Sequence, residues 1–426
     1  ALLAALPLAA QKRAFTIEDI YRLQYASGPT VSATGALAYG TSRSDLKAQK
    51  SYSNIVVNGK TITTDNKSFS PFWSADGRTL YYVSMASGSS QLYAWHDGKA
   101  TQLTDYALGI DGAIVSPDGN LIAFAAEVYP EIGGADGKAN KAAIERKAKN
   151  PIQAHIADHL LYRHWTEYSD GKYWHIIVYN LKNKTYTDVT PGRFHSPVFS
   201  PNGPSGFVFS PDSKELCYLS NHDEHPEATT NCDLWVVPVT GGEAKNITAE
   251  NKAWDGSPQY SPDGRYIAYR FQRTPGYESD RFILGLYDRK TGQKRVLTEK
   301  FDNWVDDYKW SDDSKKIYFL GEVRGAEPLY ELDVKTGKRR CLIADKAISG
   351  FDFDGKGNLW FSYSTTGKPT AIYQTTLKNP KKITQITHYN DSLEAAVDIR
   401  PSEQMWVKGA DGDSVEVFIV KPYGFD

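Results

Sequence analysis

The chain has 426 residues, of which 40% are hydrophobic and 13% aromatic, and this is enough apolar material to bury a large core. Its 49 basic and 51 acidic residues give a formal net charge of −2, which argues against a nucleic-acid surface or a polybasic membrane anchor. No apolar run reaches the roughly 20 residues that span a bilayer. We therefore expect neither nucleic acid nor a membrane span for this protein.

The N-terminal segment ALLAALPLAAQKR, residues 1–13, is similar to the end of a secretory signal peptide, with small residues at Ala9 and Ala10. It lacks the methionine and the basic region that begin such a signal, so a cloning remnant or a short apolar helix is the alternative. We expect an exported protein, either periplasmic or secreted.

From residue 14 to about residue 400 the chain repeats one pattern: an apolar strand, a turn of the Ser-Pro-Asp-Gly type and an alternating strand. Proline fixes φ, aspartate bonds the backbone ahead of it, and glycine supplies a positive φ where the chain reverses. The copies are spaced 42 to 51 residues apart, except for 94 residues between Asp118 and Asp212. This period predicts an all-β fold, a seven-bladed β-propeller. The turns are centred on Thr34, Asp76, Asp118, Asp212, Asp263, Asp313 and Lys356.

The long interval predicts an insertion over residues 127–173, after the second strand of the third blade. Its sequence changes to helical spacing, and Pro151 is expected to begin a second helix that places Ile152, Ile156, Leu160 and Arg163 on one face. Two other long loops, 221–231 and 272–281, also follow the second strand of their blades. All three are therefore expected on the same face of the propeller.

Within the insertion, His155 and His159 stand four residues apart, a spacing that can hold a metal on a helix. No third ligand accompanies them, so structural histidines are the alternative, and we expect no metal and no cofactor. Cys217, Cys232 and Cys341 show no metal spacing either. Cys217 and Cys232 flank a loop and either form a disulfide or remain free buried thiols.

The stretch LLYRHWTEYSDGKYW at 160–174 mixes aromatic, cationic and acidic residues. Arg163 is suited to a carboxylate or carbonyl, Glu167 to an amine, and Tyr162 and Trp165 to the walls of a pocket. The alternative is a charged edge on a helix that docks at the propeller rim.

The loop GYESDR offers a second acidic and aromatic group, formed by Tyr277, Glu278 and Asp280. Its carboxylates are suited to an ammonium group, and the alternative is a solvated turn. A nucleophile is not expected: NGPSGF at 202–207 breaks the G-x-S-x-G pattern at Phe207 and lacks the strand and helix around it. No catalytic triad is predicted within this chain.

The chain closes with WVKGADGDSVEVFIVKPYGFD at 406–426, which predicts a strand, a turn at Asp411–Gly412 and a second strand. The opening FTIEDIYRL with its Thr16–Asp19 capping box, the repeated turns, the 160–174 stretch, the GYESDR loop and this hairpin together resemble the prolyl oligopeptidase family of serine peptidases. Within that family, the dipeptidyl peptidase 5-like branch of bacterial periplasms and the acylaminoacyl peptidases are the most similar.

The resemblance implies that residues 401–426 lead into an α/β-hydrolase domain that carries the catalytic serine, aspartate and histidine beyond Asp426, so that this chain alone would be inactive. The propeller would cover the active site and admit short peptides, whose free amino terminus Glu167, Glu278 and Asp280 are candidates to bind. The parent protein would then be a serine dipeptidyl peptidase, and its partners would be such peptides and the hydrolase domain.

Two other interpretations stay open at this point. The chain is alternatively a periplasmic propeller that works alone by binding proteins, although the terminal hairpin has no blade to complete. A propeller enzyme with its site in the central channel would need histidines or paired carboxylates on the innermost strands, where FWS, VFS and KWS offer apolar residues.

Overall fold

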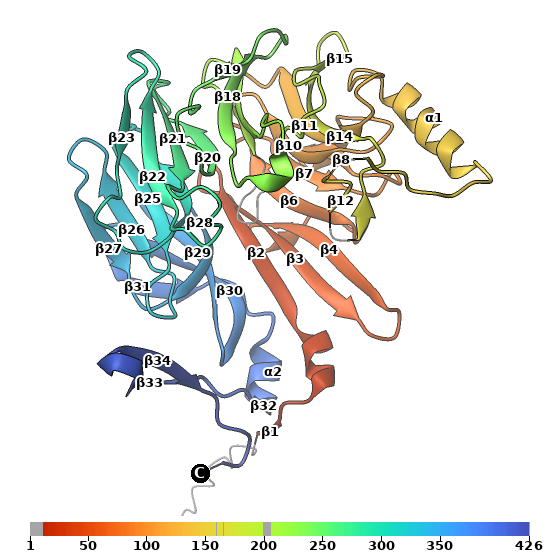
Figure 1. Cartoon of the computed structure of the whole chain (residues 1–426). Helices are drawn as coiled ribbons and strands as arrows, with labels where there is room; N and C mark the ends of the chain where they lie inside the picture. Colours follow the sequence, from red (N-terminus) through yellow and green to blue (C-terminus); the bar gives the residue numbers. More distant parts are fainter. Residues whose placement is uncertain (1–11, 159, 165, 199–205, 426) are drawn as a thin grey trace, which may run out of the picture. The chain divides into compact units, whose positions relative to one another are not determined.

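The computed structural model describes residues 12–158, 160–164, 166–198 and 206–425 (Figure 1). These residues form seven four-stranded sheets, each built from strands that follow one another in the sequence. The predicted seven-bladed β-propeller is thereby confirmed. The chain divides into two compact units: one comprises the described residues up to Pro71, Val323–Pro328 and the chain from Leu342 onward, and the other comprises Phe72–Glu322 and Leu329–Cys341.

The first unit contains the first and seventh blades, in which β2 contacts β28, β29 and β30. The backbone N–H of Val31 donates to Asp352 Oδ2 at 2.7 Å, and the side chain of Asn390 exchanges two hydrogen bonds with the backbone of Gln24, at 3.0 and 2.8 Å. The two end blades therefore pack together without sharing a strand. They consist of β2 (Gln24–Val31), β3 (Leu37–Asp45), β4 (Lys50–Val57) and β5 (Lys60–Thr61), and of β28 (Ala347–Phe353), β29 (Asn358–Thr365), β30 (Lys368–Thr376) and β31 (Asn379–Gln385).

The predicted capping box opens the 3-10 helix η1 (Ile17–Arg22), where Asp19 Oδ2 accepts the Thr16 N–H at 2.9 Å. Asp19 is buried, and Arg13 donates to both of its oxygens at 2.6 Å. These bonds lower the pKa of Asp19. Strand β1 (Arg13–Ala14) pairs in parallel with β32 (Val397–Asp398), which follows helix α2 (Asp391–Ala396), and so ties the two ends of the described chain.

The predicted terminal hairpin is also present, as β33 (Glu403–Lys408), the turn η3 (Ala410–Gly412) and β34 (Ser414–Ile419). Asp411 adopts a φ of 54° in the turn. The hairpin's large apolar side chains stay about half exposed, including Trp406 at 50% and Phe418 at 48%. The hairpin thus presents unburied apolar surface in the first unit.

The second unit carries blades two to six, except that the first residues of β6, up to Pro71, and the last residues of β27, from Leu342, belong to the first unit. Blade two consists of β6 (Ser68–Trp73), β7 (Leu80–Ser84), β8 (Gln91–His96) and β9 (Lys99–Gln102), and blade three of β10 (Asp111–Val115), β11 (Leu121–Val128), β14 (Tyr173–Asn180) and β15 (Thr185–Asp188). Blade four consists of β16 (Phe207–Phe209), β17 (Glu215–Ser220), β18 (Asp233–Pro238) and β19 (Lys245–Asn246), and blade five of β20 (Asp255–Tyr260), β21 (Tyr266–Phe271), β22 (Ile283–Asp288) and β23 (Lys294–Val296). Blade six consists of β24 (Val305–Trp310), β25 (Lys316–Gly321), β26 (Leu329–Asp333) and β27 (Arg339–Ile343).

The repeated turn motif has a common hydrogen-bond pattern. In five blades the serine hydroxyl lies 2.6 to 2.7 Å from the aspartate two residues on. In blade five, for example, Ser261 Oγ also accepts the Tyr266 N–H at 2.9 Å, and Gly264 adopts a φ of 71°. The motif thus closes the turn between the first two strands of each blade, which is why its spacing reports the blades.

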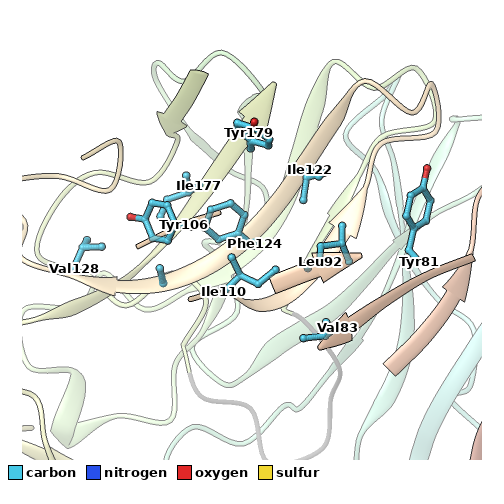
Figure 2. Close-up of a cluster of buried hydrophobic side chains, with 12 residues drawn as sticks. Tyr81, Val83, Leu92, Tyr106, Ile110, Ile122, Phe124, Val128, Ile177 and Tyr179 are labelled. Atoms are coloured by element: carbon cyan, nitrogen blue, oxygen red, sulfur yellow. The ribbon is translucent and has the colours of Figure 1, made fainter. Parts of the chain in front are cut away.

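Neighbouring blades bury apolar side chains between them, as Figure 2 shows for the cluster of the second and third blades. Phe124 and Ile122 are fully buried there, and the ring of Tyr106 lies 5.0 Å from that of Phe124. Cys217 and Cys232 lie in the core between blades four and five as free, buried thiols, so the disulfide alternative is wrong. No helix in the described ranges is long and apolar enough to cross a membrane.

Candidate functional site

Three long loops leave the ends of the second strands of three adjacent blades in the second unit. They are residues 129–172 after β11, 221–232 after β17 and 272–282 after β21. The last two are joined directly, because the Gly276 N–H donates to Thr230 Oγ1 at 2.9 Å. These loops make up the candidate site.

The first part of the insertion is firmly anchored to the third blade. Helix α1 (Gly137–Ala148) begins at Asp136, whose side chain accepts the Ala139 N–H at 2.8 Å. The hydroxyl of Tyr106 donates to the carbonyl of Gly134 at 2.7 Å, and the Gly134 N–H donates to Asp188 Oδ2 at 2.7 Å. The insertion is therefore held by Tyr106 from the connection between β9 and β10 and by Asp188 at the end of β15.

The second predicted helix is wrong, because the described residues between Pro151 and Tyr162 form no helix. After α1, Asn150 Oδ1 accepts the Ile152 N–H at 3.0 Å, which closes a local turn instead. Ile152 and Ile156 are 75% and 92% exposed, so the apolar face that would have stabilised a helix has nothing to pack against.

His155 does not lie on a helix, so the helical spacing considered for a metal with His159 does not arise from it. His155 stacks on Tyr168 with ring centroids 3.7 Å apart, and its Nδ1 lies 2.8 Å from Asp170 Oδ1. Burial alone would raise the pKa of Asp170, but the hydrogen bond with His155 and the charge of Lys147 lower it overall. His159 lies outside the described residues. His155 is thus part of a local polar contact.

A two-stranded hairpin brings three of the predicted site residues together. Strands β12 (Arg163–His164) and β13 (Glu167–Tyr168) pair so that Arg163 faces Tyr168, and the Ser169 N–H donates to the Tyr162 carbonyl at 3.0 Å. Tyr162, Arg163 and Glu167 are all exposed. Trp165 lies outside the described residues. Glu167 pairs with His164, so Arg163 and Glu167 alternate to opposite faces of this hairpin.

The 272–282 loop divides its predicted residues between two roles. Asp280 Oδ2 accepts the N–H groups of Arg273 and Thr274, both at 2.8 Å, and its Oδ1 accepts the Arg281 N–H at 2.8 Å. Partial burial raises the pKa of Asp280, but these hydrogen bonds lower it overall. Its carboxylate therefore organises the loop, whereas Tyr277 (55% exposed) and Glu278 point to solvent.

A stack of three rings on the same face was not apparent from the sequence. His222 lies between Phe194 and Trp235, with centroid separations of 3.9 and 4.1 Å. Burial between the rings lowers the pKa of His222. Phe194 is 39% exposed and forms the outer face of this stack. The rings come from three separate segments, and only the length of the 221–231 loop hinted at them.

The buried histidine of the third blade has a structural role. His175 Nδ1 lies 2.7 Å from Asp188 Oδ2, and its Nε2 lies 2.8 Å from the carbonyl oxygen of Gly192. Because both ring nitrogens face acceptors, neither faces a hydroxyl that it could activate. Residues 202–205 of the broken NGPSGF motif lie outside the described residues.

The first strand of blade six carries two adjacent aspartates, which the apolar KWS segment did not suggest. Asp306 Oδ1 accepts a hydrogen bond from Arg270 at 3.1 Å, and Arg270 is only 1% exposed. Burial raises the pKa of Asp307. Asp306 therefore serves as the partner of a buried arginine.

Comparison with known proteins gives no matching family model. Dipeptidyl-peptidase 5 of Porphyromonas gingivalis is 28% identical over 437 residues, which cover 96% of this chain and 61% of that protein. Dipeptidyl-peptidase 5 of Porphyromonas endodontalis is 30% identical over 396 residues, covering 89% and 55%. The chain thus spans about three fifths of the length of the curated relatives it matches.

Solved structures share the fold. Acylaminoacyl peptidase of Pyrococcus horikoshii matches with a TM-score of 0.72 at 16% identity, over 95% of this chain and 59% of the other. The propeller domain of the trilobed protease of Pyrococcus furiosus, described as having an open velcro topology, gives 0.57 at 15% identity, over 86% and 97%. A prolyl endopeptidase gives 0.59 at 11% identity, over 96% and 56%. The chain is a homologue of the proteins named dipeptidyl-peptidase 5, and its fold matches the N-terminal propeller of the prolyl oligopeptidase family.

Proposed function

We propose that this chain is the substrate-gating propeller of an exported serine exopeptidase that releases dipeptides, with the bond-breaking residues supplied by a hydrolase domain of the same protein. The observation that carries the proposal is the match of nearly the whole chain to proteins named dipeptidyl-peptidase 5. The apolar sequence of residues 1–13 supports the exported location.

The exposed carboxylates of Glu167 and Glu278 are the proposed partners of the peptide's free amino terminus. Both stand on loops that leave the same ends of their blades, and both are exposed. A bound ammonium would form charge-assisted hydrogen bonds with them, whereas an acetylated terminus has no charge to offer. Asp280 acts indirectly, because its oxygens hold the loop that presents Glu278.

The apolar surface of the terminal hairpin supports a partner domain. Trp406, Phe418 and Ile419 of the hairpin are 50%, 48% and 40% exposed, and exposed apolar surface of this kind marks an interaction site. In this proposal the hairpin packs against the hydrolase domain, where an acyl-enzyme forms on serine and water releases the dipeptide.

The test uses the natural full-length protein and two fluorogenic dipeptide substrates that differ only in N-terminal acetylation. We expect the protein to cleave the substrate that has a free amino terminus. A Glu167→Gln, Glu278→Gln variant should lose about tenfold in kcat/KM for that substrate, since exposed charge pairs contribute up to about 1 kcal/mol each. Glu243→Gln, at an exposed turn of the fourth blade, is the control and should leave kcat/KM unchanged.

Equal cleavage of both substrates would remove the amine-binding role of Glu167 and Glu278. Cleavage of neither substrate would refute the peptidase assignment itself.

A further inference from the structure

A cleft of about 550 Å³ lies between the fourth and fifth blades, within the second unit. It is lined by the turns and outer strands of these blades, and Gly264 and Arg265 in its wall belong to the Ser-Pro-Asp-Gly turn of blade five. The three loops of the candidate site leave the opposite ends of the strands. The cleft is therefore separate from that site.

The inner wall of the cleft is apolar. It is formed by side chains from β18, the segment after β19, β21 and β22: Val236, Ile247, Ile267 and Tyr287. Ile267 is fully buried and Ile247 and Tyr287 are nearly so, so these side chains are a fixed part of the interblade core. The apolar surface that stays open to a ligand is that of Val236, which is partly buried, and Pro238, which is exposed.

The rim of the cleft is strongly basic. Four of its lining residues are lysine or arginine and one is an acid, Glu215. Arg289 donates to Glu215 Oε1 at 2.7 Å, and the hydroxyl of Tyr260 donates to the same oxygen at 2.9 Å. Arg265 donates to Asp288 Oδ2 at 3.2 Å. The single acid on the rim is thus already neutralised.

Two ammonium groups on the rim remain without a carboxylate partner among the described residues. Lys245 and Lys290 line the cleft and are exposed, and within the described part of the chain no carboxylate pairs with either. Like charges around one concave surface raise its positive potential and attract anions into it. An inorganic anion would leave the apolar wall unused, so the wall and the rim together fit a ligand with apolar and acidic groups side by side.

We propose that this cleft binds a short acidic peptide segment in which carboxylates alternate with aliphatic side chains. Lys245 and Lys290 take the carboxylates, and the aliphatic side chains lie against Val236 and Pro238. The cleft volume is within the range of peptide-sized and drug-sized ligands. The segment is a docking motif and not a substrate, because the candidate site faces the other way.

The test is fluorescence anisotropy of the natural full-length protein with labelled acetyl-Glu-Leu-Asp-Leu-Glu-amide. Both ends of this probe are blocked, so it has no free amine for the proposed peptidase site. We expect saturable binding that weakens as salt rises, and a loss of about tenfold in affinity in a Lys245→Glu, Lys290→Glu variant. Lys99→Glu, Lys141→Glu is the matched control, since both lysines are exposed and lie outside the cleft.

Two altered probes separate the contribution of the apolar wall from that of the two lysines. Replacing the leucines by serine should weaken binding through the apolar wall, and replacing the acids by glutamine and asparagine should weaken it through the lysines. Binding that the control variant loses equally, or that a polyphosphate matches without the apolar groups, would overturn the proposal. Unchanged melting temperatures of both variants exclude misfolding as the cause, and peptidase activity is unaffected in either outcome.

Discussion

Replacement of His175 by leucine should destabilise the protein through the base of the insertion. His175 is fully buried, and its two ring nitrogens face Asp188 Oδ2 at 2.7 Å and the Gly192 carbonyl at 2.8 Å. Leucine removes both ring contacts and leaves the nearly buried Asp188 carboxylate with one hydrogen-bond partner fewer.

The magnitude follows from what Asp188 retains. Leaving a buried polar group without a hydrogen-bond partner typically costs about 1–3 kcal/mol in the free energy of unfolding. Asp188 still accepts the N–H groups of Gly134 at 2.7 Å and Thr190 at 3.2 Å, so we expect the middle of this range, about 2 kcal/mol. With an unfolding entropy of about 2.1 cal/mol/K per residue, this loss lowers Tm by roughly 2–3 °C.

Calorimetry of His175→Leu, Asp188→Asn and the double variant measures the interaction directly. We expect the double variant to lose about 1–2 kcal/mol less than the sum of the single variants. Limited proteolysis should also cut the insertion faster in His175→Leu, because Asp188 Oδ2 holds both His175 and Gly134. His96→Leu, whose side chain is 52% exposed, is the control. Additive losses, or a loss below about 1 kcal/mol, would refute this account of the pair.

Two further predictions concern stability. Burial, and then the charge of Asp233, raise the pKa of Asp255 well above its ordinary value. The folded state therefore binds the proton of Asp255 more tightly than the unfolded state does, and the protein loses stability as pH rises through the raised pKa. Asp255→Asn should therefore raise Tm relative to the wild type by an amount that grows with pH, and an equal difference at acidic and neutral pH would contradict this. Gly137→Ala should destabilise the protein by about 1–3 kcal/mol despite the better helix propensity of alanine, because the new Cβ would lie 2.7 Å from the buried Tyr106 ring. Urea unfolding measures this effect, with Lys138→Ala at an exposed position as the control. Equal unfolding midpoints for the two variants would count against the prediction.

The blades could be predicted from the sequence because their signal is local. The serine and aspartate of each turn bond to one another and to a backbone N–H within five residues, as Ser116 does with Asp118 and Leu121. Such turns need no distant partner, so their residues specify the structure wherever they occur. The same holds for the terminal hairpin, whose strands pair across a short turn.

The prediction of a second helix in the insertion failed because that helix would have needed a distant surface to pack against. Helical spacing stabilises a helix only where the apolar face is buried, and an isolated helix of about a dozen residues is marginal. Helix α1 has a side-chain cap at Asp136 and the contact of Gly137 with Tyr106. The segment after Pro151 has Ile156 in solvent at 92% exposure. The pattern alone cannot say which helix will find a surface.

The role of Asp280 was equally hidden, because an aspartate that binds a ligand and one that organises a loop have the same place in the sequence. Only the positions of three backbone N–H groups around its oxygens assign it to the loop. The stack of Phe194, His222 and Trp235 depends in the same way on tertiary structure, since its rings are brought together from three segments.

These cases suggest how to find function on this propeller. Charges that serve the fold are paired: Asp19 with Arg13, Arg270 with Asp306, and Glu215 with Arg289. A charge held in place by the scaffold but left to solvent costs the fold little, and it is available to a ligand. Glu278 on a loop that Asp280 fixes, and Lys290 beside an apolar wall, meet this description on opposite ends of the same blade. The two proposed sites, an acidic one for an amine and a basic one for a carboxylate, therefore lie at opposite ends of the fifth blade.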